Sequence, residues 1–308
     1  MDIKIQQLSK KYGPQRAVDS INFEVKTGEI LGFLGPNGAG KTTTMKMITS
    51  YVEMDEGDIL INGRSIKGGA MKKHIGYLPE HNPLYTEMPV IDFLQFSAAL
   101  QGVPNNRIAE RVVEMVRVCG LDAEKHKRIQ ELSKGYRQRV GLAQAMIHDP
   151  DILILDEPTT GLDPNQIVEI RALIRKLGQE KTVILSTHIL PEVEATCDRI
   201  LIINKGKIVA DGTADMLRKQ AQGKQVLQVR LEGEADALNM LHQIQALTTV
   251  SFAEIEDAES KRFEVQSNAD QTSNKAIFDL CVRQGWTLAE MIPFETKLED
   301  IFRDLTLN

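Results

Sequence analysis

The feature that most constrains how this chain can fold is the glycine-rich segment GPNGAGKT at residues 35–42. Its spacing is typical of a loop that binds phosphate through its backbone N–H groups. A short apolar run at residues 30–34 precedes the segment, and residues 42–48 continue it as the opening turns of a helix. Glycine at positions 35, 38 and 40 lets the backbone approach phosphate without a Cβ in the way. Strand, loop and helix together predict a nucleoside-triphosphate site.

Each residue type in this loop suits one part of a bound nucleotide. The free N–H groups and the positive end of the helix dipole attract the phosphates. Lys41 is expected to reach the β- and γ-phosphates of ATP, and the Thr42 hydroxyl is expected to ligate Mg²⁺. The predicted cradle consists of Gly35, Asn37, Gly38, Ala39, Gly40, Lys41, Thr42 and Thr43.

Two carboxylates follow a second apolar run. Residues 152–155 are apolar throughout, as expected for a central strand of a parallel sheet, and Asp156 and Glu157 come next. Asp156 is expected to hold Mg²⁺ opposite Thr42. Glu157 is expected to take the proton of an attacking water. Acidic pairs after strands also cap turns, but a phosphate loop in the same chain favours catalysis.

Length and composition limit the remaining possibilities. At 308 residues the chain exceeds one typical core, so two domains are expected. No apolar run approaches the ~18 residues of a membrane helix, and no secretory signal opens the chain. Three scattered cysteines predict free thiols in a reducing cytoplasm. A formal net charge of −6 argues against nucleic acid as the main partner.

Changes of periodicity divide the first two thirds of the chain into parts. Residues 1–28 alternate apolar and polar side chains, which predicts antiparallel strands. Residues 90–147 have helical periodicity and form a helical insert in an otherwise α/β pattern. A helix over residues 164–177 is expected to end at Gly178 as its C-cap.

A polar stretch at residues 220–224 predicts the boundary between two domains, residues 1–219 and residues 225–308. Beyond this stretch the pattern is strand, helix, strand, strand, helix, strand. That order predicts a small ferredoxin-like α+β domain, for which we expect a role in dimer or partner contacts.

Residues 132–139, with the sequence LSKGYRQR, resemble the signature of the ATP-binding cassette (ABC) family, commonly Leu-Ser-Gly-Gly-Gln. Leu132, Ser133 and Gly135 match this signature, whereas Lys134 and Tyr136 depart from it. By its local chemistry Ser133 is a good helix N-cap. The resemblance implies that Ser133 and Gly135 also bind the γ-phosphate of ATP held by a second copy.

Four further positions match or depart from the family pattern. The resemblance implies that Tyr12 stacks on adenine, although it could be a plain strand tyrosine. Asp163 matches a position in the family's loop that communicates between the two ATP sites, and helix capping before proline would equally explain it. His188 matches a histidine that contacts the γ-phosphate. Glu80 stands where the family generally has a glutamine that ligates Mg²⁺, and a carboxylate can offer the metal an oxygen too.

The resemblance covers about residues 1–215 and implies the fold class. This is an α/β P-loop ATPase core, with a mixed or parallel sheet, an antiparallel β subdomain and a helical subdomain near residues 90–147. The C-terminal α+β domain is additional to this core. The family mechanism implies a homodimer that sandwiches two ATP molecules with Mg²⁺.

The resemblance also implies a role and partners. The expected protein is the ATPase subunit of an ABC transporter, cytoplasmic and peripheral on the inner face of the cell membrane. It would contact the membrane only through a separate permease of the ABC-2 type. Residues 75–85 are similar to ATP-binding subunits associated with bacterial gliding motility, and residues 296–302 to the C-terminal extension of ABC-2-type exporter subunits. The alternative is a soluble ATPase of the same family that regulates a non-transport machine through its C-terminal domain.

Overall fold

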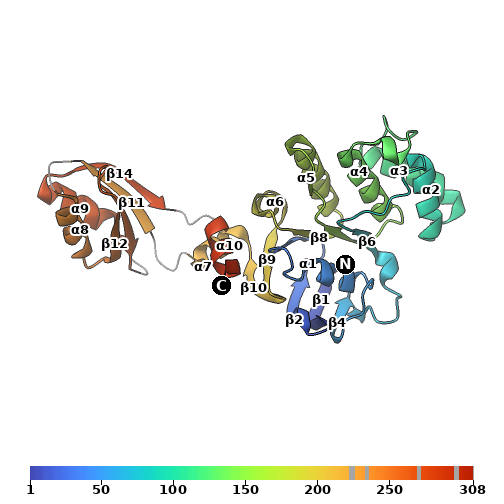
Figure 1. Cartoon of the computed structure of the whole chain (residues 1–308), viewed down its shortest axis with the longest axis horizontal. Coiled ribbons are helices and arrows are strands. Elements are labelled where there is room, and N and C mark those ends of the chain that lie inside the picture. The colour runs from blue at the N-terminus through green and yellow to red at the C-terminus, as the bar shows by residue number, and fades with distance from the viewer. Residues whose placement is uncertain (222–225, 233–235, 269–271, 295–297, 308) are drawn as a thin grey trace. The chain divides into compact units, whose positions relative to one another are not determined.

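The computed structural model describes residues 1–221, 226–232, 236–268, 272–294 and 298–307 (Figure 1). The chain divides into two compact units, Met1–Ala214 with Leu305–Asn308, and Asp215–Asp304. Residues 222–225 and 295–297 lie outside the described part. The expected domain limits at 219 and 225 therefore remain predictions, and the segment expected to resemble exporter subunits is described only from residue 298.

A six-stranded sheet forms the centre of the first unit, in the order β10-β9-β3-β8-β7-β6. Neighbouring strands from β9 to β6 are parallel, and β10 pairs antiparallel with β9. Every residue of β3, β7 and β8 is buried, which explains their continuous apolar runs. The six strands are β3 (Ile30–Leu34), β6 (Ile75–Leu78), β7 (Ile152–Asp156), β8 (Thr182–Thr187), β9 (Arg199–Asn204) and β10 (Lys207–Gly212).

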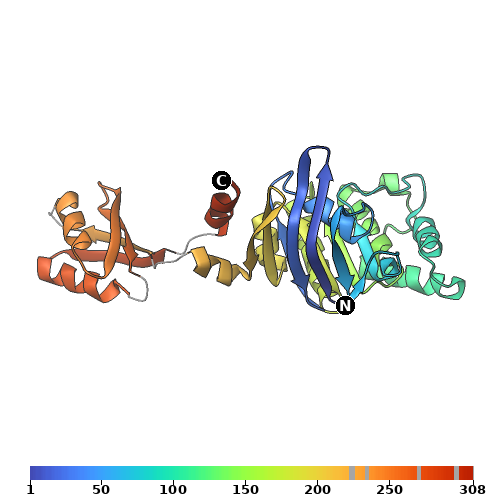
Figure 2. The same cartoon turned by 90° about the horizontal axis from the view of Figure 1, so that it is seen from below.

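An antiparallel sheet in the order β2-β1-β4-β5 packs on one face of the central sheet, as the alternation of residues 1–28 predicts (Figure 2, blue). Its inward side chains share a core with α1 and with Phe33 of β3. The rings of Phe23 and Phe33 are 5.6 Å apart between centroids. The elements are β1 (Ile3–Tyr12), β2 (Gln15–Val25), β4 (Glu56–Ile61), β5 (Arg64–Ser65) and α1 (Lys41–Ile48).

Successive side chains along a central strand point to opposite faces of the sheet, and each face packs against a different helix. In β7, Ile152 and Ile154 belong to the core shared with α1, whereas Leu153 and Leu155 belong to the core shared with α5 (Figure 1). The helices of this second core include the predicted helical insert. They are α2 (Val90–Leu100), α3 (Asn105–Val118), α4 (Lys134–Met146) and α5 (Pro164–Gly178), and the shorter α6 (Leu190–Thr196) packs on β3.

The expected C-cap role of Gly178 is wrong. Gly178 is the last residue of α5, and the C-cap residue that follows, Gln179, has right-handed dihedrals. A Cβ on Gly178 would lie 2.3 Å from Ile30 Cδ1. Glycine is needed there because α5 packs closely against the start of β3.

The second unit has the predicted ferredoxin-like topology. Its sheet has the order β12-β13-β11-β14, with every pair of neighbours antiparallel. Its core includes Leu227, Phe263, Met240 and Ile277. The elements from residue 214 onward are α7 (Ala214–Ala221), β11 (Val226–Glu232), α8 (Ala237–Gln245), β12 (Val250–Asp257), β13 (Arg262–Ser267), α9 (Asn274–Gln284), β14 (Thr287–Phe294) and α10 (Leu298–Leu307). The three cysteines of the chain are all free, as expected.

Gly32→Ala is expected to destabilise the first unit. The new methyl group would lie 2.2 Å from Val193 Cγ1 and 2.9 Å from Cys197 Sγ. Overpacking of this kind costs about 1–3 kcal/mol of unfolding free energy. Val193→Ala removes the obstructing methyl groups, so the double variant should recover part of the loss. Urea denaturation followed by circular dichroism measures this, and losses that simply add in the double variant would contradict the packing argument.

Candidate functional site

The glycine-rich loop connects β3 to α1, as the sequence predicts, and its glycines have separate tasks. A Cβ on Gly35 would lie 2.5 Å from the Ile203 carbonyl oxygen, and one on Gly40 would lie 2.4 Å from the Ala17 carbonyl oxygen. Close approach of the protein's own backbone therefore requires both glycines. Gly38, with a φ of 78°, has open space where a Cβ would stand, and it lines the pocket. Of the three, Gly38 fits the expectation that glycine leaves room for phosphate.

A pocket of about 530 Å³ opens above this loop. It joins residues from β1, the loop, α1 and the segments after β6, β7 and β8. Lys41, Thr42 and Glu157 form its inner wall, and the half-exposed Tyr12 stands among the lining residues. The predicted site residues that line the pocket are Tyr12, Asn37, Gly38, Gly40, Lys41, Thr42, Thr43, Glu80, Glu157 and His188. Thr160, which sequence reasoning missed, lines it as well.

Lys41 is held by its own loop. Its Nζ donates to the carbonyl oxygens of Gly35 at 2.8 Å and Pro36 at 3.2 Å. It also lies 3.5 Å from Glu157 Oε1, and both side chains are only 6% exposed. The lysine charge is therefore buried beside an opposite charge, at the floor of the cradle where a phosphate would arrive.

Asp156 has one satisfied and one unsatisfied oxygen. Its Oδ1 accepts hydrogen bonds from the hydroxyls of Thr42, at 3.3 Å, and Ser186. Its Oδ2 is buried and has no hydrogen-bond partner among the described residues. Burial raises the pKa of Asp156, and the nearby carboxylate of Glu157 adds to this. A cation at Oδ2 would satisfy that oxygen and stabilise its charge.

These oxygens fit Mg²⁺. Among the described residues no group of three or more His, Cys, Asp or Glu side chains could hold a metal ion unaided. Mg²⁺ typically takes one or two protein carboxylates and completes its shell with water and substrate phosphates. Thr42 and Asp156 supply such a partial shell. Glu80, which lines the pocket above the loop together with Thr42, is a further candidate ligand.

Glu157 turns out of its strand toward His188. Its φ of 50° is rare for a residue with a side chain, and its N–H donates to the Ser186 carbonyl oxygen at 3.0 Å. His188 Nδ1 lies 2.9 Å from Glu157 Oε2 and 3.1 Å from Oε1. Thr160 Oγ1 donates to Oε2 at 3.3 Å. The carboxylate is thus fixed in the pocket by three neighbours, Lys41 included.

The remaining predicted residues do not line this pocket. Ser133 caps α4, since its Oγ accepts from the Tyr136 N–H at 3.4 Å. Asp163 caps α5, since its Oδ1 accepts from the Gln166 N–H at 2.9 Å. Gly135 packs against the side chain of Gln166, which lies 2.7 Å from where a Cβ would stand. Ser133 and Asp163 are therefore both helix N-caps within one chain, as their local chemistry predicts. A phosphate in the pocket above the glycine loop of the same chain would not be bound by Ser133, Gly135 or Asp163.

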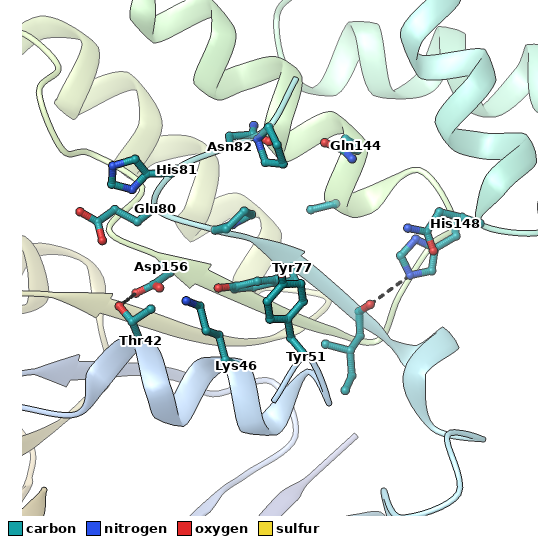
Figure 3. Close-up of a pocket in the computed structure, with 15 residues that line it drawn as sticks. Thr42, Lys46, Tyr51, Tyr77, Glu80, His81, Asn82, Gln144, His148 and Asp156 are labelled. Carbon is teal, nitrogen blue, oxygen red and sulfur yellow. Dashed lines mark hydrogen bonds between the residues drawn. The ribbon is translucent and has the colours of Figure 1, made fainter. Parts of the chain in front are cut away.

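A second cavity, of about 450 Å³, lies between α1, β6 and α4 (Figure 3). It shares Thr42 and Glu80 with the pocket above the glycine loop. Tyr77 Oη, Asn82 Nδ2 and His148 Nδ1 are buried there without a hydrogen-bond partner in the described part of the chain. Sequence reasoning missed this cavity. The one feature of the sequence that pointed to this cavity is that Tyr77 and Asn82 lie close to Glu80 in the chain.

His148 closes the far end of this cavity from Glu80 (Figure 3). Its Nε2 lies 3.2 Å from the Ile75 carbonyl oxygen. Burial lowers the pKa of His148, and the Ile75 hydrogen bond opposes this only in part.

The comparisons with known proteins agree with this geometry. A family model described as "ABC transporter" matches residues 18–160. The "Uncharacterized ABC transporter ATP-binding protein YhcH" of Bacillus subtilis (strain 168) is 37% identical over 309 residues, which covers 99% of this chain and 95% of YhcH. The chain belongs to the ATP-binding subunits of ABC transporters.

Two more relatives refine the comparison. The "Bacitracin transport ATP-binding protein BcrA" of Bacillus licheniformis is 37% identical over 245 residues, 78% of each chain. A solved structure entitled "Structure of ATP binding subunit of ABC transporter" is 32% identical, with a TM-score of 0.64. It covers 72% of this chain and 93% of its own. The fold is that of the ABC ATPases, and the homologues include a subunit named for bacitracin transport.

His148→Gln is expected to weaken the acid dependence of stability. The lowered pKa of His148 means that the unfolded chain binds a proton that the folded chain does not. The wild type should therefore lose stability as the pH falls through the ordinary histidine value of about 6.5. Glutamine can still donate to the Ile75 carbonyl oxygen but does not titrate.

The measurement is the difference in urea midpoint between about pH 7.5 and pH 5.5, a range that spans the ordinary histidine pKa. The difference should be smaller in His148→Gln than in the wild type. His126→Gln removes an exposed histidine as a matched control and should behave like the wild type. An unchanged pH dependence in His148→Gln would show that this group does not contribute.

Proposed function

We propose that this chain is the ATP-hydrolysing subunit of an ABC transporter of the exporter type, with its membrane permease on another chain. The observation that supports this best is that Lys41, Thr42, Glu157 and His188 line one pocket above the glycine loop, where Thr42 also donates a hydrogen bond to Asp156. These side chains supply a phosphate clamp, metal oxygens and a proton acceptor, which phosphoryl transfer to water needs together.

ATP would lie with its phosphates on the N–H groups of residues 35–43. Lys41 would then exchange the carbonyl oxygens of Gly35 and Pro36 for the β- and γ-phosphates. Tyr12 would stack on adenine at the pocket rim. When bound, Mg²⁺ would be held by Thr42 and Asp156, with Glu80 beside them, and would neutralise charge on the phosphates.

Glu157 would accept the proton of the water that attacks the γ-phosphate. His188 would bind Glu157 through one ring nitrogen and the γ-phosphate through the other, which would hold the base and the reacting group in one geometry. Glu157 is 6% exposed, so little of its carboxylate is open to bulk solvent.

The signature segment implies that two copies act together. Ser133 and Gly135 stand at the N-terminus of α4, outside the pocket of their own chain. We propose that they, with Asp163, face the ATP of a second copy in an ATP-dependent homodimer. The positive end of the α4 dipole suits a phosphate there.

The membrane partner is proposed to be an ABC-2-type permease. None of the helices that the structure describes is long and apolar enough to cross a membrane. The naming of BcrA for bacitracin transport supports a transport role, and we propose export as its direction. The helical insert and the Glu80 loop would transmit closure to the permease, with the chain cytoplasmic and peripheral on the membrane. The gliding-motility interpretation rests on residues 75–85 alone and stays a hypothesis.

Glu157→Gln is expected to keep ATP binding and lose turnover. Glutamine keeps the shape of the side chain but cannot take the proton, so kcat should fall about 100-fold or more. Phosphate release measures turnover, and a fluorescent ATP analogue measures binding. Glu180→Gln, at an exposed carboxylate, is the matched control and should leave both unchanged. A Glu157→Gln protein that hydrolyses ATP briskly would refute the assignment of the base.

Lys41→Ala is expected to lose nucleotide affinity. The lysine would make charge-assisted hydrogen bonds to two phosphates, each of about 1.5–3 kcal/mol, so the Kd for ATP should rise by roughly tenfold or more. Titration calorimetry with ATP and Mg²⁺ measures the change. Lys26→Ala, at an exposed lysine before β3, should bind like the wild type. Unchanged affinity in Lys41→Ala would contradict the phosphate role.

A further inference from the structure

Glu192 in α6 is a buried carboxylate that the proposed chemistry does not use. Glu192 is 1% exposed. Oε2 accepts a hydrogen bond from Thr187 Oγ1 at 2.9 Å, whereas Oε1 is buried with no hydrogen-bond partner among the described residues. A carboxylate buried in this way is costly, and an apolar side chain of similar size would fill the space without that cost. The bond to Thr187 is therefore the feature that needs an explanation.

Thr187 links this carboxylate to the backbone on both sides of His188. A hydroxyl has one hydrogen to donate, and the Thr187 hydroxyl donates it to Glu192 Oε2. Glu192 therefore fixes the direction of that hydrogen. A lone pair of the same oxygen then accepts the Ile189 N–H at 3.1 Å. The Thr187 carbonyl oxygen accepts the N–H of Gly35, the first glycine of the phosphate loop, at 3.4 Å.

His188 stands between these two anchored residues, directly after β8 ends. Its side chain is 42% exposed and lies 2.9 Å from Glu157 Oε2. Packing alone constrains a side chain of that exposure weakly. The backbone bonds at Thr187 and Ile189 must therefore aim the ring at Glu157.

We propose that Glu192 is a positioning residue for His188. Through the Thr187 hydroxyl it fixes the turn from Thr187 to Ile189, and so holds the imidazole against Glu157 in the nucleotide pocket. This inference rests on the proposed function for its effect on hydrolysis. The effect on the placement of His188 does not depend on hydrolysis.

A double-mutant cycle on kcat tests the proposal. Glu192→Leu keeps the volume and removes the acceptor, so kcat should fall about tenfold or more as the base and the histidine lose their alignment. In a His188→Ala background the same change should cost less than about twofold, because the group it positions is gone. Glu192→Gln keeps an acceptor oxygen and should restore most of the rate. KM for ATP should change less than kcat.

Val193→Ala is the matched control on the same helix. Val193 is fully buried and packs toward Gly32, so its truncation should lower the urea midpoint. The apolar side chain of Val193 cannot hydrogen-bond to Thr187. Its truncation should therefore leave kcat within about twofold of the wild type. Equal losses of kcat in Val193→Ala and Glu192→Leu would mean that Glu192 only stabilises α6, and would overturn the proposal.

A second measurement is independent of turnover. In protein labelled with ¹⁵N-histidine, the ring signals of His188 are assigned by their loss in His188→Ala. Glu192→Leu, and Thr187→Val as a second variant that breaks the same link, should both shift those signals, and Glu192→Gln should not. Unshifted His188 signals in both variants, or losses of kcat that add in the cycle, would refute the proposal. A wild type that does not hydrolyse ATP would refute the proposed function, while the ring signals would still decide the role of Glu192.

Discussion

The site depends on three adjacent parallel strands, β3, β8 and β7, whose carboxyl ends lie side by side. β8 pairs with β3 on one side and β7 on the other, in a register that sets Ser186 opposite both Phe33 and Asp156. All three strands therefore deliver their next residues to the same edge of the sheet. β3 delivers the glycine loop, β7 delivers Glu157, and β8 delivers His188. Asp156 accepts from Ser186 and from Thr42, so one carboxylate oxygen ties the ends of these segments together.

The sequence could predict the parts of this site but not the way they meet. Loop spacing and apolar runs identify Lys41, Asp156 and the strands around them, because each signal lies within a few consecutive residues. His188 and Glu157 are 31 residues apart, and their contact follows from the order β3-β8-β7, which no local pattern contains. The second cavity was missed for the same reason, since its walls come from five separated segments of the chain. Gly178 was misassigned because a glycine that ends a helix and one that admits a neighbouring strand look alike in sequence.

The electrostatics of the pocket favour the proposed ATP as a complex with a cation. Asp156 and Glu157 are nearly fully buried, and the pKa of Asp156 is raised chiefly by burial, so this end of the sheet resists further negative charge. Lys41 is a nearby positive charge, and Glu157 and two carbonyl oxygens already engage it. The proposed triphosphate would add negative charge beside these two carboxylates. A divalent cation on Thr42 and Asp156 would oppose that repulsion, because it would satisfy Asp156 Oδ2 and offset the phosphate charge together.

Glu80 connects the charges of the nucleotide pocket to a second part of the first unit. It lines both the nucleotide pocket and the second cavity, as does Thr42 (Figure 3). A glutamine would offer the metal an oxygen without charge, whereas a carboxylate adds a negative charge that the cation must also offset. If Glu80 joins the proposed metal shell, its interaction with the cation would also alter the wall of the second cavity. A change of contacts at a residue shared by two sites is the physical requirement for coupling between them.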